Sequence, residues 1–188
     1  MKRAVDIVFS LLALLLLSPL LLVTLVCIAL ESGWPVFFVQ QRCGLRGRPF
    51  GMLKFRSMVK NAADIGPYFT AAGDPRITRV GRWIRSTSID ELPQIINVLR
   101  GDMSLVGPRP DVPAQRGLYT DAQWAERCSV RPGITGLAQV VNRSGGTDAE
   151  RLALDLQYVR SIKQGFAVWR DVKIMAMTIG RLSGKGAN

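Results

Sequence analysis

The sequence predicts a mostly helical α+β protein with a small β-hairpin and an apolar N-terminal segment that lies in a membrane. Three observations predict this class. Residues 7–30 carry no charged side chain. Two runs rich in β-formers, 36–40 and 50–55, flank the turn-rich segment 43–49. Apolar residues at helical spacing recur in the remainder of the chain. We therefore expect a membrane segment at 1–33 and a globular domain at 34–188.

The N-terminal segment has more than one interpretation. Its twenty-four uncharged residues cover about 36 Å as a straight helix, which is enough to span a bilayer. A signal peptide fits less well, because the apolar run is too long and no A-x-A-like cleavage site follows it.

Ser18 and Pro19 lie in the middle of this run. A proline inside a helix removes a hydrogen bond and kinks the helix, and a neighbouring serine can satisfy the freed carbonyl. Basic residues flank both ends of the segment, so the positive-inside rule favours placing both ends in the cytoplasm. From these residues, a spanning helix and a re-entrant helix that bends at Ser18-Pro19 both remain open.

Composition limits the chemistry. The net charge is +11, from 25 Lys+Arg against 14 Asp+Glu, which favours nucleic acid, a membrane surface or phosphate-bearing substrates as partners. The absence of histidine excludes His-based triads and HExxH zinc sites. Cys27, Cys43 and Cys128 show neither a disulfide framework nor zinc spacing. Catalysis is therefore left to carboxylates, lysine, tyrosine, serine or cysteine.

The elements after the expected hairpin follow from local patterns. Val80, Trp83 and Ile84 have the spacing of a short amphipathic helix. Ser88 is expected to cap the next helix, with Glu91 as its capping-box partner and Gly101 at its end. Residues 101–113 are expected to form a loop, and Leu137–Val141 is a possible strand.

Two helices are expected at the C-terminal end, at 148–163 and 168–182. The second combines an apolar face with basic residues. It can lie flat on a membrane surface or pack against the core of the domain, and both interpretations remain open. Its apolar face comprises Val172, Met175, Ile179 and Leu182, and its basic residues are Arg170, Lys173 and Arg181.

Adjacent carboxylates, Asp90 and Glu91, stand at the centre of the sequence. Alone, such a pair can simply compensate a helix dipole. Here arginines surround it, and the Gly-Pro-Arg-Pro loop at 107–110 follows. Phosphoryl transfer needs this combination: one carboxylate attacks phosphorus, its neighbour holds a divalent metal, and arginines neutralise the phosphates. A basic face against lipid head groups is the alternative interpretation of the arginines, which are Arg76, Arg79, Arg82, Arg85, Arg100 and Arg109.

The segments 78–85, 88–94 and 97–110 strongly resemble the bacterial sugar transferase family, the monotopic phosphoglycosyl transferases that start cell-surface glycan assembly. The resemblance extends to 54–58, 131–136 and 154–159, and so covers nearly the whole chain. The chain looks like the minimal form of this family.

The resemblance implies a two-step reaction. Asp90 would attack the β-phosphate of a UDP-sugar and release UMP, and polyprenyl (undecaprenyl) phosphate would then take the phosphosugar from Asp90. Glu91 matches the metal-binding carboxylate, for Mg²⁺. Arg85 and Arg109 would bind phosphates, and Lys54 and Arg56 would support the same basic pocket. Asp155 matches a family position for which we expect a structural role, such as pairing with an arginine.

The resemblance also favours the re-entrant interpretation, because Ser18-Pro19 matches the helix-breaking pair of the family. It implies a monotopic protein of the bacterial inner membrane, with amphipathic interfacial helices and with a catalytic domain, 34–188, on the cytoplasmic face. A homodimer is possible. Val140-Val141 stands where many relatives carry Asn-Gly, which could bear on sugar specificity.

Two rival classes fit less well. A nucleic-acid binder would explain the charge, but no aromatic stacking surface is interleaved with the arginines. A structural membrane tether would be favoured by a lost carboxylate pair, and both carboxylates are present.

Overall fold

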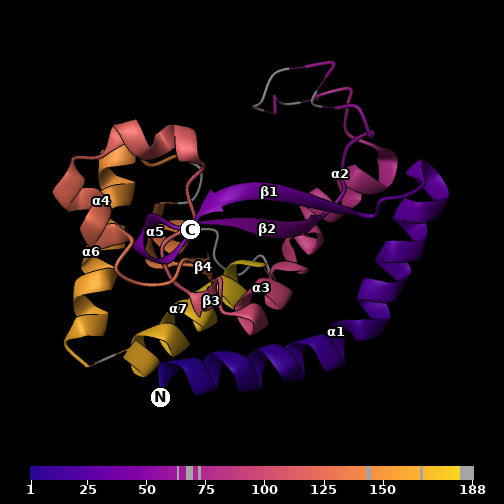
Figure 1. Ribbon diagram of the computed structural model, residues 1–188. Coiled ribbons are helices and arrows are strands. Elements are labelled where there is room, and N and C mark those ends of the chain that lie inside the picture. Colours follow the sequence, from indigo (N-terminus) through magenta and orange to yellow (C-terminus); the bar gives the residue numbers. More distant parts are fainter. Residues whose placement is uncertain (63, 67–69, 72, 143–144, 166, 183–188) are drawn as a thin grey trace.

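The computed structural model describes residues 1–62, 64–66, 70–71, 73–142, 145–165 and 167–182. Figure 1 shows a long helix along the base and one side of the molecule, the β-hairpin across the middle, and α4 and α6 at the far side. The α+β class with a small sheet is confirmed. In chain order the elements are α1 (Lys2–Ser32), β1 (Phe37–Cys43), the short 3₁₀ turn η1 (Leu45–Gly47), β2 (Pro49–Phe55), α2 (Arg79–Ser86), η2 (Ile89–Glu91), α3 (Gln94–Arg100), β3 (Ser104–Val106), η3 (Pro113–Leu118), α4 (Asp121–Arg127), β4 (Gly133–Thr135), α5 (Leu137–Asn142), α6 (Asp148–Lys163) and α7 (Ala167–Leu182).

The helix α1 continues through Pro19 and does not end at the Ser18-Pro19 pair. Figure 1 shows its direction changing partway along, from the base of the molecule to its side. Pro19 has no N–H, so the carbonyl of Leu15 loses its helical donor. The hydroxyl of Ser18 donates to that carbonyl at 2.8 Å, as expected from the sequence. The backbone is thus satisfied at the proline without water.

The apolar side chains of α1 face outward. The helix is long and apolar enough to cross a membrane by length and composition. Its fully buried residues are instead mostly polar, namely Asp6, Ser10 and Thr24, together with Ile28. A water-soluble helix buries its leucines, so this inverted pattern is typical of a helix surrounded by lipid.

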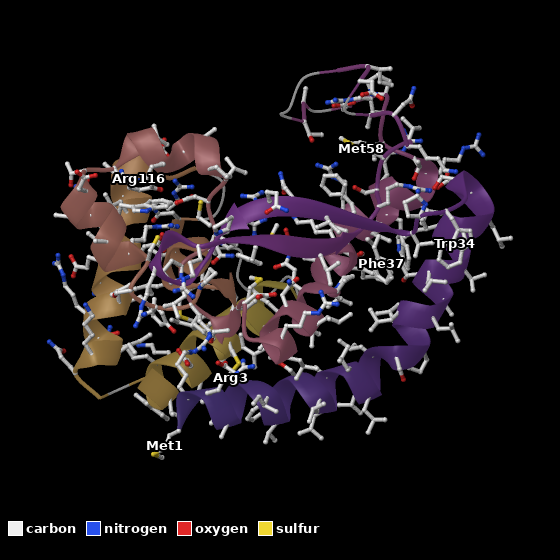
Figure 2. The ribbon with its side chains drawn as sticks, in the orientation of Figure 1. Met1, Arg3, Trp34, Phe37, Met58 and Arg116 are labelled. Carbon is white, nitrogen blue, oxygen red and sulfur yellow. The ribbon has the colours of Figure 1, made fainter. Side chains whose placement is uncertain are left out.

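The N-terminal end of α1 is bound to the domain by polar contacts. Arg3 donates to the carbonyls of Val98 and Leu99 at 2.6 and 3.0 Å, at the C-terminal end of α3 (Figure 2). Buried Asp6 accepts a hydrogen bond from the hydroxyl of Ser104 at 2.9 Å. Arg3 therefore satisfies helix carbonyls that have no partner within α3.

The C-terminal end of α1 is bound to the same domain. Glu31 accepts hydrogen bonds from the backbone N–H groups of Arg79 and Val80 at 2.8 and 3.0 Å. These are the first residues of α2, where a negative charge is favoured by the helix dipole. Both ends of α1 are consequently attached to one globular body.

The hairpin matches the expected one. Its strands pair antiparallel from Phe37 opposite Phe55 to Cys43 opposite Pro49. At the open end, the rings of Phe37 and Phe55 stack with centroids 5.4 Å apart. At the closed end, Arg46 adopts a left-handed conformation with φ 57°, which turns the chain.

Two loops that are far apart in the sequence lie side by side. Strand β3 pairs parallel with β4, with Ser104 opposite Gly133. A Cβ on Gly133 would lie 2.0 Å from the backbone nitrogen of Gly107, so this approach requires glycine. The expectation of a continuous loop over 101–113 was therefore wrong, because part of it pairs across sequence distance.

The segment Leu137–Val141 was expected to be a strand and is the helix α5. Val140 and Val141 favour strands by local propensity. Here Ala138 and Val140 are buried where α5 packs against α6 and α7, and this packing decides the outcome.

The helix expected to begin at Ser88 was also wrong. Ser88 has a left-handed conformation, with φ 58° and ψ 17°, and its side chain makes no capping hydrogen bond. The turn η2 follows, and α3 begins only after Pro93. A helix running on from Ser88 would place Pro93 in its interior, where it lacks a donor and clashes with the preceding turn. The end of α3 at Gly101, with φ 94°, is confirmed.

The two C-terminal helices are confirmed. Thr147 and Glu150 form a capping box at the start of α6. In α7, Ile174 is buried in a cluster with Val106, Val140 and Tyr158. Trp169 and Ile179 on the same helix are exposed. The helix thus packs against the core with one face and shows apolar side chains on another.

Candidate active site

Three distant segments meet at Glu91. One oxygen of its carboxylate accepts hydrogen bonds from Lys54 Nζ at 2.8 Å and from Arg109 Nη2 at 2.6 Å. The other oxygen accepts one from Arg109 Nη1 at 3.3 Å. Lys54 comes from β2, Glu91 from η2, and Arg109 from the loop after β3. The structure therefore brings together three of the predicted site residues.

The environment keeps Glu91 ionised. Burial alone would raise the pKa of its carboxyl group, but Arg109 and then Lys54 outweigh burial and lower the pKa to about 2. The two-point contact with Arg109 matches the planar fork of a guanidinium. Glu91 is thus a fixed negative charge at neutral pH.

The pKa of Asp90 is shifted in the opposite direction to that of Glu91. Burial, followed by the charge of Glu91, raises the pKa of Asp90, while Lys54 and Arg85 lower it, and the net shift is upward. The pair therefore has one permanently ionised carboxylate and one more basic carboxylate. Neighbouring acids whose pKa values are pushed apart commonly have different catalytic roles.

Arg85 lies in the last turn of α2. Its charge lowers the pKa of Asp90, so it lies close enough to the turn with Asp90 and Glu91 to act on it electrostatically. Close packing fixes α2 at this place: a Cβ on Gly81 would lie 1.9 Å from the carbonyl oxygen of Ser57.

Arg56 does not join these residues. Its buried guanidinium donates to the carbonyl and the hydroxyl of Ser32 at 2.9 and 2.8 Å, and to the carbonyls of Gly33 and Pro35. A continued strand would place Arg56 on the same face as Lys54, but β2 ends at Phe55. Arg56 instead satisfies the carbonyls at the end of α1, which is a structural role.

A buried cluster that the sequence did not indicate holds Arg109 in place. Arg127 donates to the backbone carbonyl of Arg109 at 2.6 Å. Its guanidinium also pairs with Asp111 at 2.6 Å and with Asp155 at 2.9 Å. The expected structural pairing of Asp155 with an arginine is confirmed. Arg127, Asp111 and Asp155 lie on separate elements, so no spacing pattern in the sequence links them.

A cavity of about 450 Å³ borders Glu91. Its lining is mixed: it includes apolar side chains such as Leu92 and Ile95 and the polar side chains of Thr135, Gln139 and Thr178. The hydroxyls of Thr135 and Thr178 share a hydrogen bond of 2.8 Å. The cavity thus offers hydroxyl and amide groups beside the carboxylate pair.

The carboxylate pair suits one mode of metal binding. Among the described residues, no group of three or more His, Cys, Asp and Glu side chains is placed to hold a metal ion. Mg²⁺ commonly binds through one or two carboxylates plus substrate phosphates and water. Asp90 and Glu91 fit this shared mode better than an all-protein site.

Comparisons with known proteins show the family of the chain. A model of the bacterial sugar transferase family matches residues 1–185. The UDP-glucose:undecaprenyl-phosphate glucose-1-phosphate transferase of Caulobacter vibrioides is 46% identical over 96% of this chain and 69% of the relative. The enzyme of the same name from Escherichia coli is 43% identical over 95% of this chain and 39% of its own length.

A relative named for another sugar matches equally well. The UDP-N-acetylgalactosamine-undecaprenyl-phosphate N-acetylgalactosaminephosphotransferase of Aeromonas hydrophila is 44% identical over 99% of this chain. The chain spans 44% of that relative, so several relatives are more than twice as long as the matched region.

Proposed function

The chain belongs to the bacterial sugar transferase family, and from that premise we propose that it moves a phosphosugar from a UDP-sugar to undecaprenyl phosphate. The observation that carries the proposal is the turn at Asp90 and Glu91, where Arg109 and Lys54 bind the carboxylate of Glu91, while burial and the charge of Glu91 raise the pKa of Asp90. An attacking carboxylate beside cationic groups is what transfer of a phosphoryl group requires.

In the first step, a carboxylate oxygen of Asp90 forms a bond to the β-phosphorus of the UDP-sugar. The bond between that phosphorus and the bridging oxygen breaks, and UMP leaves with the electron pair. The phosphosugar stays on Asp90 as a mixed anhydride. The raised pKa of Asp90 makes this carboxylate the better nucleophile of the pair.

In the second step, a phosphate oxygen of undecaprenyl phosphate attacks the same phosphorus, and the carboxylate of Asp90 leaves. The product is an undecaprenyl diphosphate sugar. Arg85, Arg109 and Lys54 lie around the carboxylate pair, where their charges neutralise the phosphates in both steps.

Glu91 is ionised and lines the cavity, and it would hold Mg²⁺ together with the diphosphate of the donor once Arg109 and Lys54, which bind both of its oxygens in this structure, turn to the phosphates. A bound Mg²⁺ neutralises phosphate charge and polarises phosphoryl oxygens. The polar side chains in the lining of the cavity, Thr135, Gln139 and Thr178, suit the hydroxyl groups of the sugar.

We also propose that α1 is re-entrant. The leucines of α1 are exposed on the protein surface and are removed from water if lipid surrounds the helix. Arg3 and Glu31, at its two ends, both bind the same globular domain. A helix that spanned the bilayer would leave its ends on opposite faces. Both ends of a re-entrant α1 lie on one face of the membrane. We propose the cytoplasmic face of the inner membrane, where soluble nucleotide sugars occur and the acceptor phosphate lies at head-group depth.

The test is UMP release. The detergent-purified protein is incubated with Mg²⁺, undecaprenyl phosphate and a panel of UDP-sugars that begins with UDP-glucose and UDP-N-acetylgalactosamine. We expect UMP and a lipid-linked sugar with one of the donors, and neither product with Asp90→Asn. UMP release by Asp90→Asn at the wild-type rate would exclude Asp90 as the nucleophile.

A further inference from the structure

A second hollow lies on the membrane side of the catalytic turn. It occupies the space between the bent helix α1, the open end of the hairpin and the start of α3, and its volume is about 380 Å³. We call it the elbow groove. Its walls include Leu22 and Leu25 of α1, the stacked pair Phe37 and Phe55, and Ile96 of α3. Figure 2 shows Phe37 between the hairpin and the side arm of α1.

We propose that the elbow groove binds the first isoprene units of the acceptor's polyprenyl chain. This inference rests on the proposed function and adds the place where the lipid lies. Three observations support it, and each concerns a different property of the groove: its chemistry, its opening and its position.

The lining is apolar. Among the described residues that form it, Ser18 alone is polar, and its hydroxyl already donates to the carbonyl of Leu15 at 2.8 Å. A ligand in this groove therefore meets hydrocarbon and aromatic surface without an unsatisfied hydrogen-bonding group. A phosphate, a nucleotide or a sugar would lose its hydration there without compensation. A polyprenyl chain makes no hydrogen bonds to water and so has no such cost.

The groove opens toward lipid. Leu22 lines it and is 63% exposed, on the helix whose leucines face outward. The lipid-facing surface of α1 thus continues into the groove. A chain dissolved in the bilayer can enter sideways, without crossing a polar surface.

The inner end of the groove reaches the catalytic turn. Pro93 belongs to the lining and is two residues from Glu91, so their Cα atoms are at most about 7 Å apart. Successive residues of a strand point to opposite faces. At the end of β2, Lys54 accordingly binds Glu91 while Phe55 lines the groove. One amphiphile can therefore place its phosphate at Lys54 and its chain against Phe55.

The experiment fills the groove with a larger side chain. Leu22→Trp and Ile96→Trp add bulk at its two sides, and Leu16→Trp is the matched control, because Leu16 is 77% exposed on the same helix and does not line the groove. The KM for undecaprenyl phosphate is measured in each variant. Exchange of labelled UMP into the UDP-sugar, which needs no acceptor, is measured alongside.

We expect both groove variants to raise the acceptor KM about tenfold, the effect of losing ~1.4 kcal/mol, with exchange retained and with Leu16→Trp like wild type. Retained exchange with an unchanged acceptor KM in the groove variants would overturn the proposal that the elbow groove binds the acceptor chain. Failure of exchange in the wild-type enzyme would instead refute the proposed function.

A second measurement does not depend on the variants folding. A polyprenyl phosphate carrying a diazirine in its first isoprene units is photolysed with the wild-type protein, and the labelled peptides are mapped. Labelling of α1 near Leu22 and of α3 near Ile96 is expected. Labelling confined to the cavity with Thr135 and Gln139 would overturn the proposal. So would equal competition by a phospholipid, which would make the groove a general lipid contact.

Discussion

The guanidinium of Arg127 donates to the backbone carbonyl of Arg109 at 2.6 Å, so a buried charge fixes the loop that carries the arginine bound to Glu91. Two acidic side chains surround Arg127, whose own side chain is 4% exposed. Removing one partner of a buried ion pair leaves an uncompensated charge in the interior. The integrity of this cluster therefore bears on both stability and catalysis.

We expect Asp155→Ala to destabilise the protein by about 3–5 kcal/mol, because it leaves Arg127 without one of its two buried partners. Thermal or denaturant unfolding in detergent measures the change. Asp121→Ala is the matched control: its carboxylate also pairs with an arginine, Arg116, but is 98% exposed, so the expected change is within about 0.5 kcal/mol. Equal effects of the two substitutions would contradict a buried structural role for Asp155.

Arg109→Lys tests the clamp on Glu91. Lysine keeps the charge but cannot donate through two nitrogens to one carboxylate or phosphate. We expect kcat/KM for the UDP-sugar to fall about a hundredfold, in the range found when one charge-stabilising donor is removed. Arg100→Lys is the control, because Arg100 lies in the same motif but is exposed at the end of α3. A wild-type kcat/KM for Arg109→Lys would remove Arg109 from the site.

The pH dependence of the exchange reaction should have one acidic limb, set by Asp90. Burial first, and then the charge of Glu91, raise the pKa of Asp90, so the nucleophile becomes protonated at a higher pH than an ordinary aspartate. Glu91, with a pKa of about 2, is still ionised there. Lys54 lowers the pKa of Asp90, so Lys54→Met should move the limb to higher pH. Arg82 is exposed, so Arg82→Met should leave the acidic limb where it is. An acidic limb that does not move in Lys54→Met would argue against the effect of Lys54 on the pKa of Asp90.

The lowered pKa of Glu91 makes the stability of the fold depend on pH. Its folded-state pKa lies below the ordinary value, so the stabilisation is present above about pH 4.3, the pKa of an unperturbed glutamate. It is lost as the pH falls through about 2. Glu91→Gln should therefore flatten the acid limb of the unfolding free energy, which unfolding curves at a series of pH values would show.

Gly133→Ala should destabilise the protein by about 1–3 kcal/mol, as overpacking commonly does. Its Cβ would lie 2.0 Å from the backbone nitrogen of Gly107, and relief of that contact would displace the loop of Arg109. Gly117→Ala is the control, because a Cβ there meets nothing within 4 Å. Denaturant midpoints measure both changes, and equal stability of the two variants would mean that the β3–β4 contact tolerates a side chain.

Local signals predicted much of the fold. The turn residues between two β-forming runs predicted the hairpin, and apolar residues at helical spacing predicted the helix at 148–163, which forms as expected. The left-handed Gly101 ends α3 as expected. These features depend on neighbours within a few residues, which a sequence shows directly.

The features that the sequence analysis predicted wrongly or did not indicate depend on contacts between residues far apart in the chain. Val140 favours a strand locally, but packing against α6 and α7 makes it helical. The position of Arg56 depends on where β2 ends. The partners of Arg127 lie on two other segments, the loop with Arg109 and Asp111 and the helix α6 with Asp155. In the candidate site, the residue types could be predicted from the motifs around Asp90. The cluster that positions Arg109 could not, because its members are far apart in sequence.

The placement of α1 in the membrane gives the last prediction. Single cysteines replace the exposed residues Ala4, in the first turn of α1, and Lys60, beyond its C-terminal end, in a background without the three native cysteines. We expect both to react with an impermeant thiol reagent only after the inner membrane is permeabilised, because both ends of a re-entrant helix lie in the cytoplasm.

The variant Pro19→Leu should convert the re-entrant α1 into a straight helix that spans the membrane. It returns an N–H to the carbonyl of Leu15, which Ser18 now satisfies, and so removes the cause of the bend. We expect the cysteine at position 4 to become reactive from the periplasmic side in this variant, and that at position 60 to stay protected. Labelling of position 4 from outside in the protein that retains Pro19 would show that α1 spans the membrane. The domain would then be tethered by one end, and the polar contacts of Arg3 and Asp6 could not form.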